Sequence, residues 1–420
     1  MGIKRLFKRY KTFKAVGLFT KIVIVLYCIR VLASAWLAFD IAGHKIFQFV
    51  ISWTGKLALL AATVYIIKVQ KKITYKNLGL CVLPTIYIIL ILLHDNDFSY
   101  FSYSIISILA IYLFLVLSDQ MKRKIVELFY EVVLISIVLS ILAYFYTILG
   151  FPVKTVNYYT TAYKTHFYYQ FGPLAILNSD GLLRMCGPFN EGGNLGTVCA
   201  FLYAIFGDKN TKVEKVILIV GIALSFSLAG WLLILVYWLG VLISKKQLKS
   251  GIIITILIVV VLILPTVDFG NEYVNSFVQR FTITSDGLNG DNRTWEGFDQ
   301  QYDSIVKSDR KWWGAGLDYK IADGSSYKSY IIIYGYLGTL MLAIPWIFMC
   351  IKHGWKAKHA IIYIMLFFVS LYQRPAPITS LFGYAMMFGG LNVMNYDYEF
   401  LDKASEDGDD DKSNAINTWI

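Results

Sequence analysis

The chain has 420 residues, of which 57% are hydrophobic and 16% charged, and its mean hydropathy is +0.57. This composition excludes an ordinary soluble domain, which carries more charge and fewer unbroken apolar runs. The formal net charge of +11 at pH 7 raises the question of a nucleic-acid partner, which the placement of the charges along the chain answers.

Apolar runs recur along the chain, and many approach the roughly 18–20 residues needed to cross a bilayer. We therefore predict an all-α polytopic membrane protein with about 12 transmembrane helices (range roughly 11–14), forming one membrane domain over residues 1–394. The first run is too long for a signal-peptide core and lacks a small-residue cleavage site, so it is expected to stay as a helix. The predicted spans are 17–39, 46–67, 78–93, 99–117, 125–149, 193–207, 215–229, 230–244, 251–266, 328–350, 360–373 and 378–394.

Basic residues are distributed unevenly between alternate loops of this topology. With a cytoplasmic N-terminus they gather in the inner segments, whereas the short outer loops hold only Lys45 and Arg374. This asymmetry follows the positive-inside rule and predicts that both termini are cytoplasmic. The charge is then a topology signal and an attraction to anionic lipid, and no nucleic-acid partner is expected. The basic inner segments are 1–16, 68–77, 119–124, 208–215, 245–249 and 352–358.

The sequence contains no recognisable metal or nucleotide motif. The cysteines form no C-x-x-C pair and the histidines show no metal-ligand spacing. Neither a phosphate-binding P-loop nor a dinucleotide fingerprint is present. We therefore expect no metal and no cofactor.

Three segments outside the predicted spans are long. Residues 150–192 are rich in tyrosine, and residues 267–327 form one large extracytoplasmic loop. The acidic segment 395–420 is predicted to be a disordered cytoplasmic tail. Within the large loop, helical spacing of apolar residues predicts an amphipathic helix on the outer membrane face or over a cavity. Those residues are Trp295, Phe298, Tyr302 and Ile305.

The two long outer segments keep positive charge against the topological bias, which indicates an anionic ligand. Arginine forks suit phosphates because they donate two parallel hydrogen bonds. Ordinary solvated charge, or contact with anionic lipid, is the alternative for any single cation. Arg184 and Arg293 stand out because each lies beside a turn or cap that would fix it. The cations are Lys154, Lys164, Arg184, Arg280, Arg293, Lys307, Arg310, Lys311, Lys320 and Lys328.

Residues 183–196, LRMCGPFNEGGNLG, place a charged pair at the start of a predicted helix. A Gly-Pro turn precedes the helix, and a helix N-terminus attracts anions. Glu191 then has two possible roles. It is either a capping charge, which Arg184 would pair with, or a general base in a poorly solvated cleft. The residues alone leave both open.

Four charges fall inside or at the ends of predicted spans. Arg30 and Lys56 lie in the first two spans, and Glu127 and Glu131 share a face near the inner end of span 125–149. A lone charge near the bilayer centre costs about 2.5–3.5 kcal/mol on insertion scales. Two explanations are possible for these four charged residues: ion pairing between helices, or a polar cavity inside the protein.

An ordered set of motifs over about 184–340 carries a family resemblance. Arg-x-x-Gly-x-Phe-x-Glu opens a helix at Arg184, a Ser-x-Ser run follows at Ser225, and the large loop contains Asn-Arg-x-x-Trp (292–295) and Trp-Gly-x-Gly (313–316). The set ends in Ser-Tyr-x-x-x-Tyr-Gly-Tyr-Leu-Gly (329–338), which leads into a helix. This order resembles the O-antigen polymerase and ligase superfamily, and the Wzy-type polymerases above all.

The resemblance implies a C-type glycosyltransferase-like enzyme that joins undecaprenyl-pyrophosphate-linked oligosaccharide repeat units into a surface polysaccharide, such as O-antigen or capsule. The reaction would take place at the outer face of the bacterial cytoplasmic membrane. The matching positions make Arg184, Arg293 and Glu191 the expected catalytic residues, with the arginines stabilising the departing pyrophosphate and Glu191 acting as the base. The expected substrate-binding residues are Arg280, Asn292, Trp295, Tyr327 and Tyr330.

Two departures from the family pattern favour a polymerase over an O-antigen ligase-type transferase. Many relatives have Ser-Arg where this chain has Ser227-Leu228, and many ligases open the helix after the large loop with a histidine, where Tyr327 stands here. A lipid-linked oligosaccharide flippase is the third alternative, although transporters usually have two related halves with short loops. The partners implied are the lipid-linked oligosaccharide, membrane lipid, a chain-length regulator and a flippase.

Overall fold

The structure is a computed structural model, and the residues that it describes begin at 16 and end at 396. They comprise 16–35, 45–71, 85, 98–160, 165–179, 182–244, short pieces between 267 and 288, 296–316, 319, 327–353, 360–373 and 380–396. The predicted span 251–266, nearly all of 78–93, and the tail beyond residue 396 lie outside the described residues.

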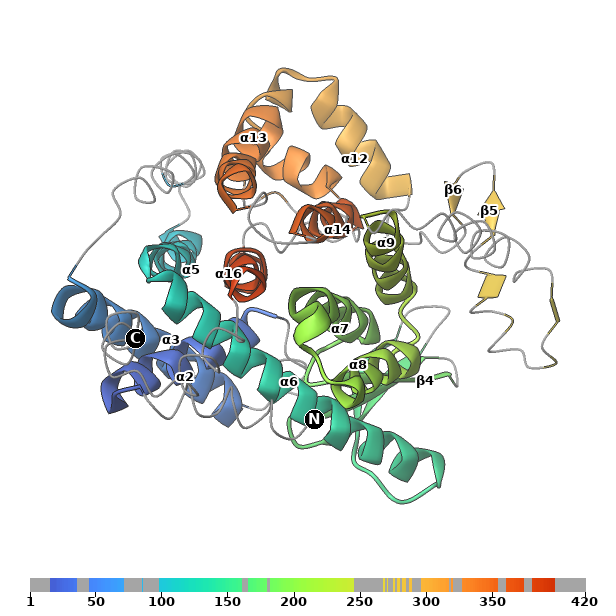
Figure 1. The fold of residues 1–420 in the computed structure, drawn as a ribbon. Helices are drawn as coiled ribbons and strands as arrows, with labels where there is room; N and C mark the ends of the chain where they lie inside the picture. The colour runs from blue at the N-terminus through green and yellow to red at the C-terminus, as the bar shows by residue number, and fades with distance from the viewer. Residues whose placement is uncertain are drawn as a thin grey trace.

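The described chain is mostly helical, in agreement with the prediction (Figure 1). The longest helix begins after Ser118, whose side chain accepts a hydrogen bond from the Met121 backbone at 3.3 Å, an N-terminal cap. The helical elements are α2 (Leu18–Ala33), α3 (Lys45–Tyr65), η2 (Ile66–Gln70), α5 (Phe98–Val116), α6 (Asp119–Ile148), α7 (Gly192–Phe206), η3 (Gly207–Lys209), α8 (Lys212–Leu224), α9 (Leu228–Ser244), α12 (Glu296–Val306), η5 (Asp309–Lys311), α13 (Lys328–His353), α14 (Ala360–Gln373), α15 (Leu381–Tyr384), η7 (Ala385–Gly389) and α16 (Gly390–Asn395).

A four-stranded antiparallel sheet occupies most of the segment 150–192, so the prediction of an all-α protein is wrong there. The strands follow one another in chain order, and Gly172, at φ +60°, turns β2 into β3 through a two-residue loop. Aromatic and β-branched residues favour strands, which is the physical reason that this tyrosine-rich stretch pairs. The strands are β1 (Thr155–Thr160), β2 (Thr165–Phe171), β3 (Leu174–Ser179) and β4 (Leu182–Gly187); β5 (Ile283–Thr284) and β6 (Gly287–Leu288) form a separate pair.

Two helices among the described residues are long and apolar enough to cross a membrane by length and composition, Phe49–Gln70 and Asp119–Ile148. They coincide with the predicted spans 46–67 and 125–149. The prediction of about 12 spans is not supported, because other apolar runs form shorter helices. α8, for example, has 13 residues and is about 20 Å long at 1.5 Å per residue, against a hydrocarbon core of about 30 Å.

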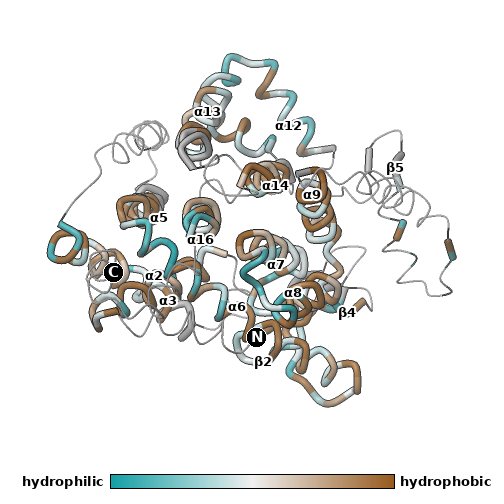
Figure 2. Tube along the Cα trace, viewed as in Figure 1, coloured by the Kyte–Doolittle hydropathy of each residue, from teal (hydrophilic) through white to brown (hydrophobic). Residues whose placement is uncertain are grey.

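The exposed apolar side chains of α3 and α6 follow helical spacing. On α3 they fall three or four residues apart and so line one face of the helix. Figure 2 shows hydrophobic stretches along several of the helices. Contiguous exposed apolar surface of this kind marks an interaction with lipid or with another protein. The exposed residues on α3 include Phe49, Trp53, Leu57, Leu60 and Val64, Ile67 of η2 continues the series, and those on α6 include Ile135, Val138, Leu139, Leu142 and Phe145.

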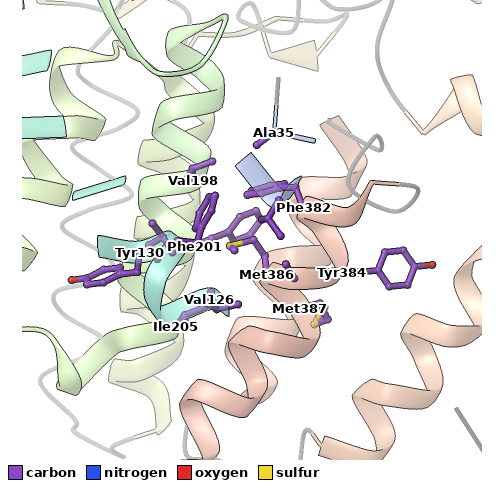
Figure 3. Packing of buried hydrophobic residues seen from close by; sticks show 14 of the residues in the cluster. Ala35, Val126, Tyr130, Val198, Phe201, Ile205, Phe382, Tyr384, Met386 and Met387 are labelled. Atoms are coloured by element: carbon purple, nitrogen blue, oxygen red, sulfur yellow. The ribbon is translucent and has the colours of Figure 1, made fainter. Parts of the chain in front are cut away.

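α7 is the central helix of the core. It lies against α8, α9, α14 and α16 (Figure 1), and 14 of its 15 residues are buried. A helix that is apolar on all sides belongs inside a protein, so the run 193–207 is better explained by protein packing than by lipid contact. In Figure 3, Val198, Phe201 and Ile205 from this helix meet Val126 and Tyr130 of α6 and Met386 of η7.

Three of the charged residues in the helices, Arg123, Glu127 and Lys56, are paired or stacked with neighbours. Arg123 Nε lies 3.4 Å from Glu127 Oε1, four residues along α6, and the guanidinium stacks on the Tyr396 ring at 3.3 Å. Lys56 lies over the Trp53 ring at 4.8 Å. The explanation by pairing therefore holds for Glu127, which pairs with Arg123 on the same helix.

Candidate functional site

The candidate site is the junction between β4 and α7, where the sequence places Arg184 and Glu191. β4 ends at Gly187, whose φ of +61° lies in the left-handed region that suits glycine. The Phe189 backbone N–H then donates to Cys186 O at 3.1 Å, which closes the turn. α7 begins at Gly192, with Glu191 as its N-cap residue in extended conformation.

Arg184 closes the C-terminal end of a different helix. Its Nε donates to Ser225 O at 3.2 Å and its Nη2 donates to Phe226 O at 3.4 Å. Ser225 is the C-cap of α8, where unpaired carbonyl oxygens and the negative end of the helix dipole favour a cation. The opening charge of the motif therefore has a structural role, which the sequence could not assign.

We expect Arg184→Leu to destabilise the protein, because it leaves the two carbonyl oxygens of the α8–α9 turn without their charged donor. The cost should be about 1.5–3 kcal/mol, the range for hydrogen bonds to charged groups. Arg184→Lys should recover part of it, since lysine keeps the charge but not the fork. Thermal unfolding of the purified variants measures the difference, and equal melting temperatures for all three proteins would contradict this role.

Small residues bring the turn between α8 and α9 against the start of α7. A Cβ atom added at Gly192 would lie 2.5 Å from Ser225 O, and one added at Gly230 would lie 2.9 Å from Gly196 O. Ser227 Oγ donates to Gly193 O at 3.4 Å and accepts from the Gly230 backbone at 3.1 Å. The segments are thus in backbone contact, and the turn carries Phe226 at φ +47°, an unusual angle for a bulky residue.

Hydrogen bonds fix the sheet and the junction to each other. The buried Tyr168 of β2 donates its hydroxyl hydrogen to Asn190 O, and Asn194 Nδ2 donates to Asn190 Oδ1 at 2.7 Å. Tyr144 of α6 donates to Leu183 O at 3.1 Å. Asn190 and Asn194 were not among the predicted site residues, although two amide side chains four residues apart at the start of a helix can hydrogen-bond to each other.

Glu191 and Arg184 both act on the buried thiol of Cys186, which lies between them in the chain. Burial raises the pKa of Cys186 to about 12, while the Arg184 charge lowers it and the Glu191 charge raises it. Both charged side chains therefore lie close enough to the thiol to affect its pKa. Because burial has the largest effect, Cys186 remains a neutral thiol without nucleophilic character at physiological pH. The Glu191 side chain makes no capping hydrogen bond to α7. The predicted alternative in which this side chain caps the helix is therefore not observed.

The second group of motif residues lies at α12, η5 and the first turns of α13. A kink at Gly335, with φ 63° and ψ −176°, interrupts α13. Carbonyl groups on either side of such a kink lose their helical donors. Ala315 N donates to Ile332 O at 2.7 Å and Gly316 N donates to Ile333 O at 3.1 Å. The Trp-Gly-x-Gly motif thus completes the hydrogen bonding of the kinked helix.

α12 covers the start of α13 with its apolar face. Phe298 and Ile305 pack on Ile332 in a small buried cluster, so the predicted amphipathic helix exists and this face rests on protein. Burial raises the pKa of Tyr302 to about 12, and its hydrogen bond with Tyr336 and the nearby Tyr327 act in the same direction.

The structure separates the predicted residues into two places. Arg184 and Glu191 lie together at the β4–α7 junction. Tyr327 is exposed and Tyr330 is buried in the core at the start of α13. Figure 1 places α12 and α13 on one side of α9 and α14, and α7, α8 and β4 on the other. Four predicted site residues lie outside the described residues, namely Arg280, Asn292, Arg293 and Trp295.

Comparisons with known proteins add no assignment to this geometry. No protein-family model, no curated protein and no solved structure matches the chain. Within the part of the chain that the structure describes, no group of three or more His, Cys, Asp or Glu side chains is placed to hold a metal ion.

Proposed function

We propose that the protein is a polytopic glycosyltransferase of the bacterial cytoplasmic membrane that joins lipid-pyrophosphate-linked oligosaccharide repeat units. The observation that carries the proposal is the β4–α7 junction. It combines an arginine, a carboxylate and a helix N-terminus on a turn that hydrogen bonds and glycine contacts hold in place. The membrane assignment is supported by the two long apolar helices and by the exposed apolar face of α3.

Arg184 has donors suited to a pyrophosphate in addition to its structural bonds. Within the described residues its guanidinium donates through Nε and Nη2, and an arginine carries five N–H groups in total. The Nη1 hydrogens and the positive end of the α7 dipole would attract negative charge to one place. Charge that develops on the leaving pyrophosphate would be stabilised there without reorganisation.

Glu191 would act as the general base in the same site. In the proposed step an acceptor hydroxyl oxygen forms a bond to the anomeric carbon of the donor sugar. The bond from that carbon to the pyrophosphate oxygen breaks, and the leaving group departs with the electron pair. The hydroxyl proton moves to the Glu191 carboxylate. Arg293, Arg280, Asn292 and Trp295 of the large loop would complete the site, whereas Tyr327 and Tyr330 lie near α13, apart from the β4–α7 junction, and have no role in this step.

The test is the product formed by the purified protein in lipid nanodiscs with a lipid-linked repeat unit. A polymerase gives a ladder of glycans that remain on the lipid carrier. A ligase moves glycans of unchanged length to another acceptor, and a flippase in proteoliposomes moves the substrate across the bilayer without forming a glycosidic bond. If a folded preparation of the protein forms no lengthened glycans, the proposal is refuted.

A further inference from the structure

The segment that follows η5 exposes two neighbouring tryptophans. Trp312 is 50% exposed and Trp313 is 61% exposed. The Trp312 ring meets the Tyr336 ring edge-on with centroids 6.0 Å apart, and Lys311 Nζ lies 5.8 Å from the same Trp312 ring. Arg310, also exposed, precedes them in the short helix. Large aromatic rings and cations are thus side by side on one surface.

The tryptophans are fixed in position relative to α13. Trp312 O accepts a hydrogen bond from the Leu337 backbone at 3.2 Å, next to the kink at Gly335. The hydrogen bonds of Ala315 and Gly316 to α13 hold the other side of the segment. A rigid attachment of this kind sets the height of the tryptophans along the axis of α13.

An exposed apolar face of α13 continues from this point. Leu337, Leu340 and Ile347 are 37%, 55% and 45% exposed, and their spacing of three and seven residues places them on one side of the helix. The ten-residue distance from the first to the last corresponds to about 15 Å, roughly half the thickness of a hydrocarbon core. The aromatic and basic residues therefore lie at one end of an apolar stripe of about one leaflet in length.

We propose that Arg310, Lys311, Trp312, Trp313 and Tyr336 form a membrane-interface anchor that binds the headgroup region of a bilayer containing anionic phospholipid. Tryptophan and tyrosine are favoured at this depth because one end of the ring system is apolar and the other is polar. The two cations pair with lipid phosphates. The anchor fixes the kink of α13 at the membrane surface and holds the segment 296–316 against the leaflet.

Charge and position together favour lipid over a protein partner at this surface. Trp312 and Tyr336 lie at the end of the apolar stripe, and Lys311 Nζ lies 5.8 Å from the Trp312 ring. α12, in contrast, turns its apolar residues towards α13 and cannot supply a lipid-facing surface of its own. The proposal concerns the membrane contact alone and does not depend on the reaction that the protein catalyses.

The test uses the full-length protein in liposomes of phosphatidylcholine and phosphatidylglycerol whose acyl chains carry bromine, which quenches tryptophan fluorescence on contact. The chain has ten tryptophans, so the signal of Trp313 is isolated as the difference between the wild type and Trp313→Phe. We expect this difference signal to be quenched strongly by bromine near the headgroup and weakly by bromine near the chain end. Trp346→Phe is the control, because Trp346 is fully enclosed and its difference signal should resist both probes.

A second arm tests the anionic lipid. The Trp313 signal should be quenched more by brominated phosphatidylglycerol than by brominated phosphatidylcholine, and Arg310→Gln with Lys311→Gln should remove the preference. Lys307→Gln is the matched control, an exposed lysine that pairs with Asp303 on α12. Quenching of Trp313 by aqueous iodide and by neither brominated lipid would overturn the anchor. Equal quenching by the two lipids in the wild type would overturn its preference for anionic headgroups.

Discussion

Glu191→Gln is expected to reduce glycan extension by roughly 10²–10⁴-fold, the usual contribution of a positioned general base. The substitution keeps the size and shape of the side chain and removes its ability to accept the proton of the acceptor hydroxyl. The melting temperature of the variant separates a loss of chemistry from a loss of stability. Loss of activity at an unchanged melting temperature would report on chemistry and not on stability.

The measurement is the rate at which lipid-linked repeat units are lengthened by the purified variant, together with its melting temperature. Asp208→Asn, at the other end of α7 and exposed to solvent, is the matched control and should keep full activity. Wild-type extension rates in Glu191→Gln would exclude Glu191 as the base. A large drop in melting temperature would instead assign it a structural role.

Gly196→Val is expected to lower the free energy of unfolding by about 3 kcal/mol, at the upper end of the range for overpacking. A Cβ atom at this position would overlap Ser227 Cβ, and it would lie 2.7 Å from Ser227 Oγ and 3.0 Å from Ser225 Oγ. On the facing helix the Gly230 backbone is already in contact with Gly196. The only relief is to move α9 and the α8–α9 turn away from α7, which would also pull Ser225 away from Arg184.

Thermal unfolding in detergent provides the measurement for this variant. Gly297→Val is the matched control, because Gly297 is also in a helix and a Cβ atom there would meet nothing within 4 Å. It should cost little, since valine is a better helix former than glycine. Similar melting temperatures for the two variants would mean that α7 and α9 are not in close backbone contact at Gly196 and Gly230.

The sequence predicted some elements well because the information for them is local. The helices at 46–67 and 125–149 follow from long apolar runs, and the amphipathic helix in the large loop follows from the spacing of Phe298 and Ile305. The start of α7 follows from its Gly-Pro turn and glycines. The sheet at β1–β4 was missed because strand pairing depends on partners further along the chain, and a tyrosine-rich stretch without an apolar run also resembles a loop.

The amino-acid sequence by itself determined the apolar and mostly helical character of the chain, the location of the two helices that are long and apolar enough to cross a membrane, and the position of the charged pair at a helix start. Only the tertiary structure decided what that pair contacts. Arg184 meets the end of α8 some forty residues away, and the Trp-Gly-x-Gly motif supplies donors to a kinked α13. These partners are fixed by the close approach of glycine backbones and by unpaired carbonyl groups, and neither leaves a periodic pattern in the sequence.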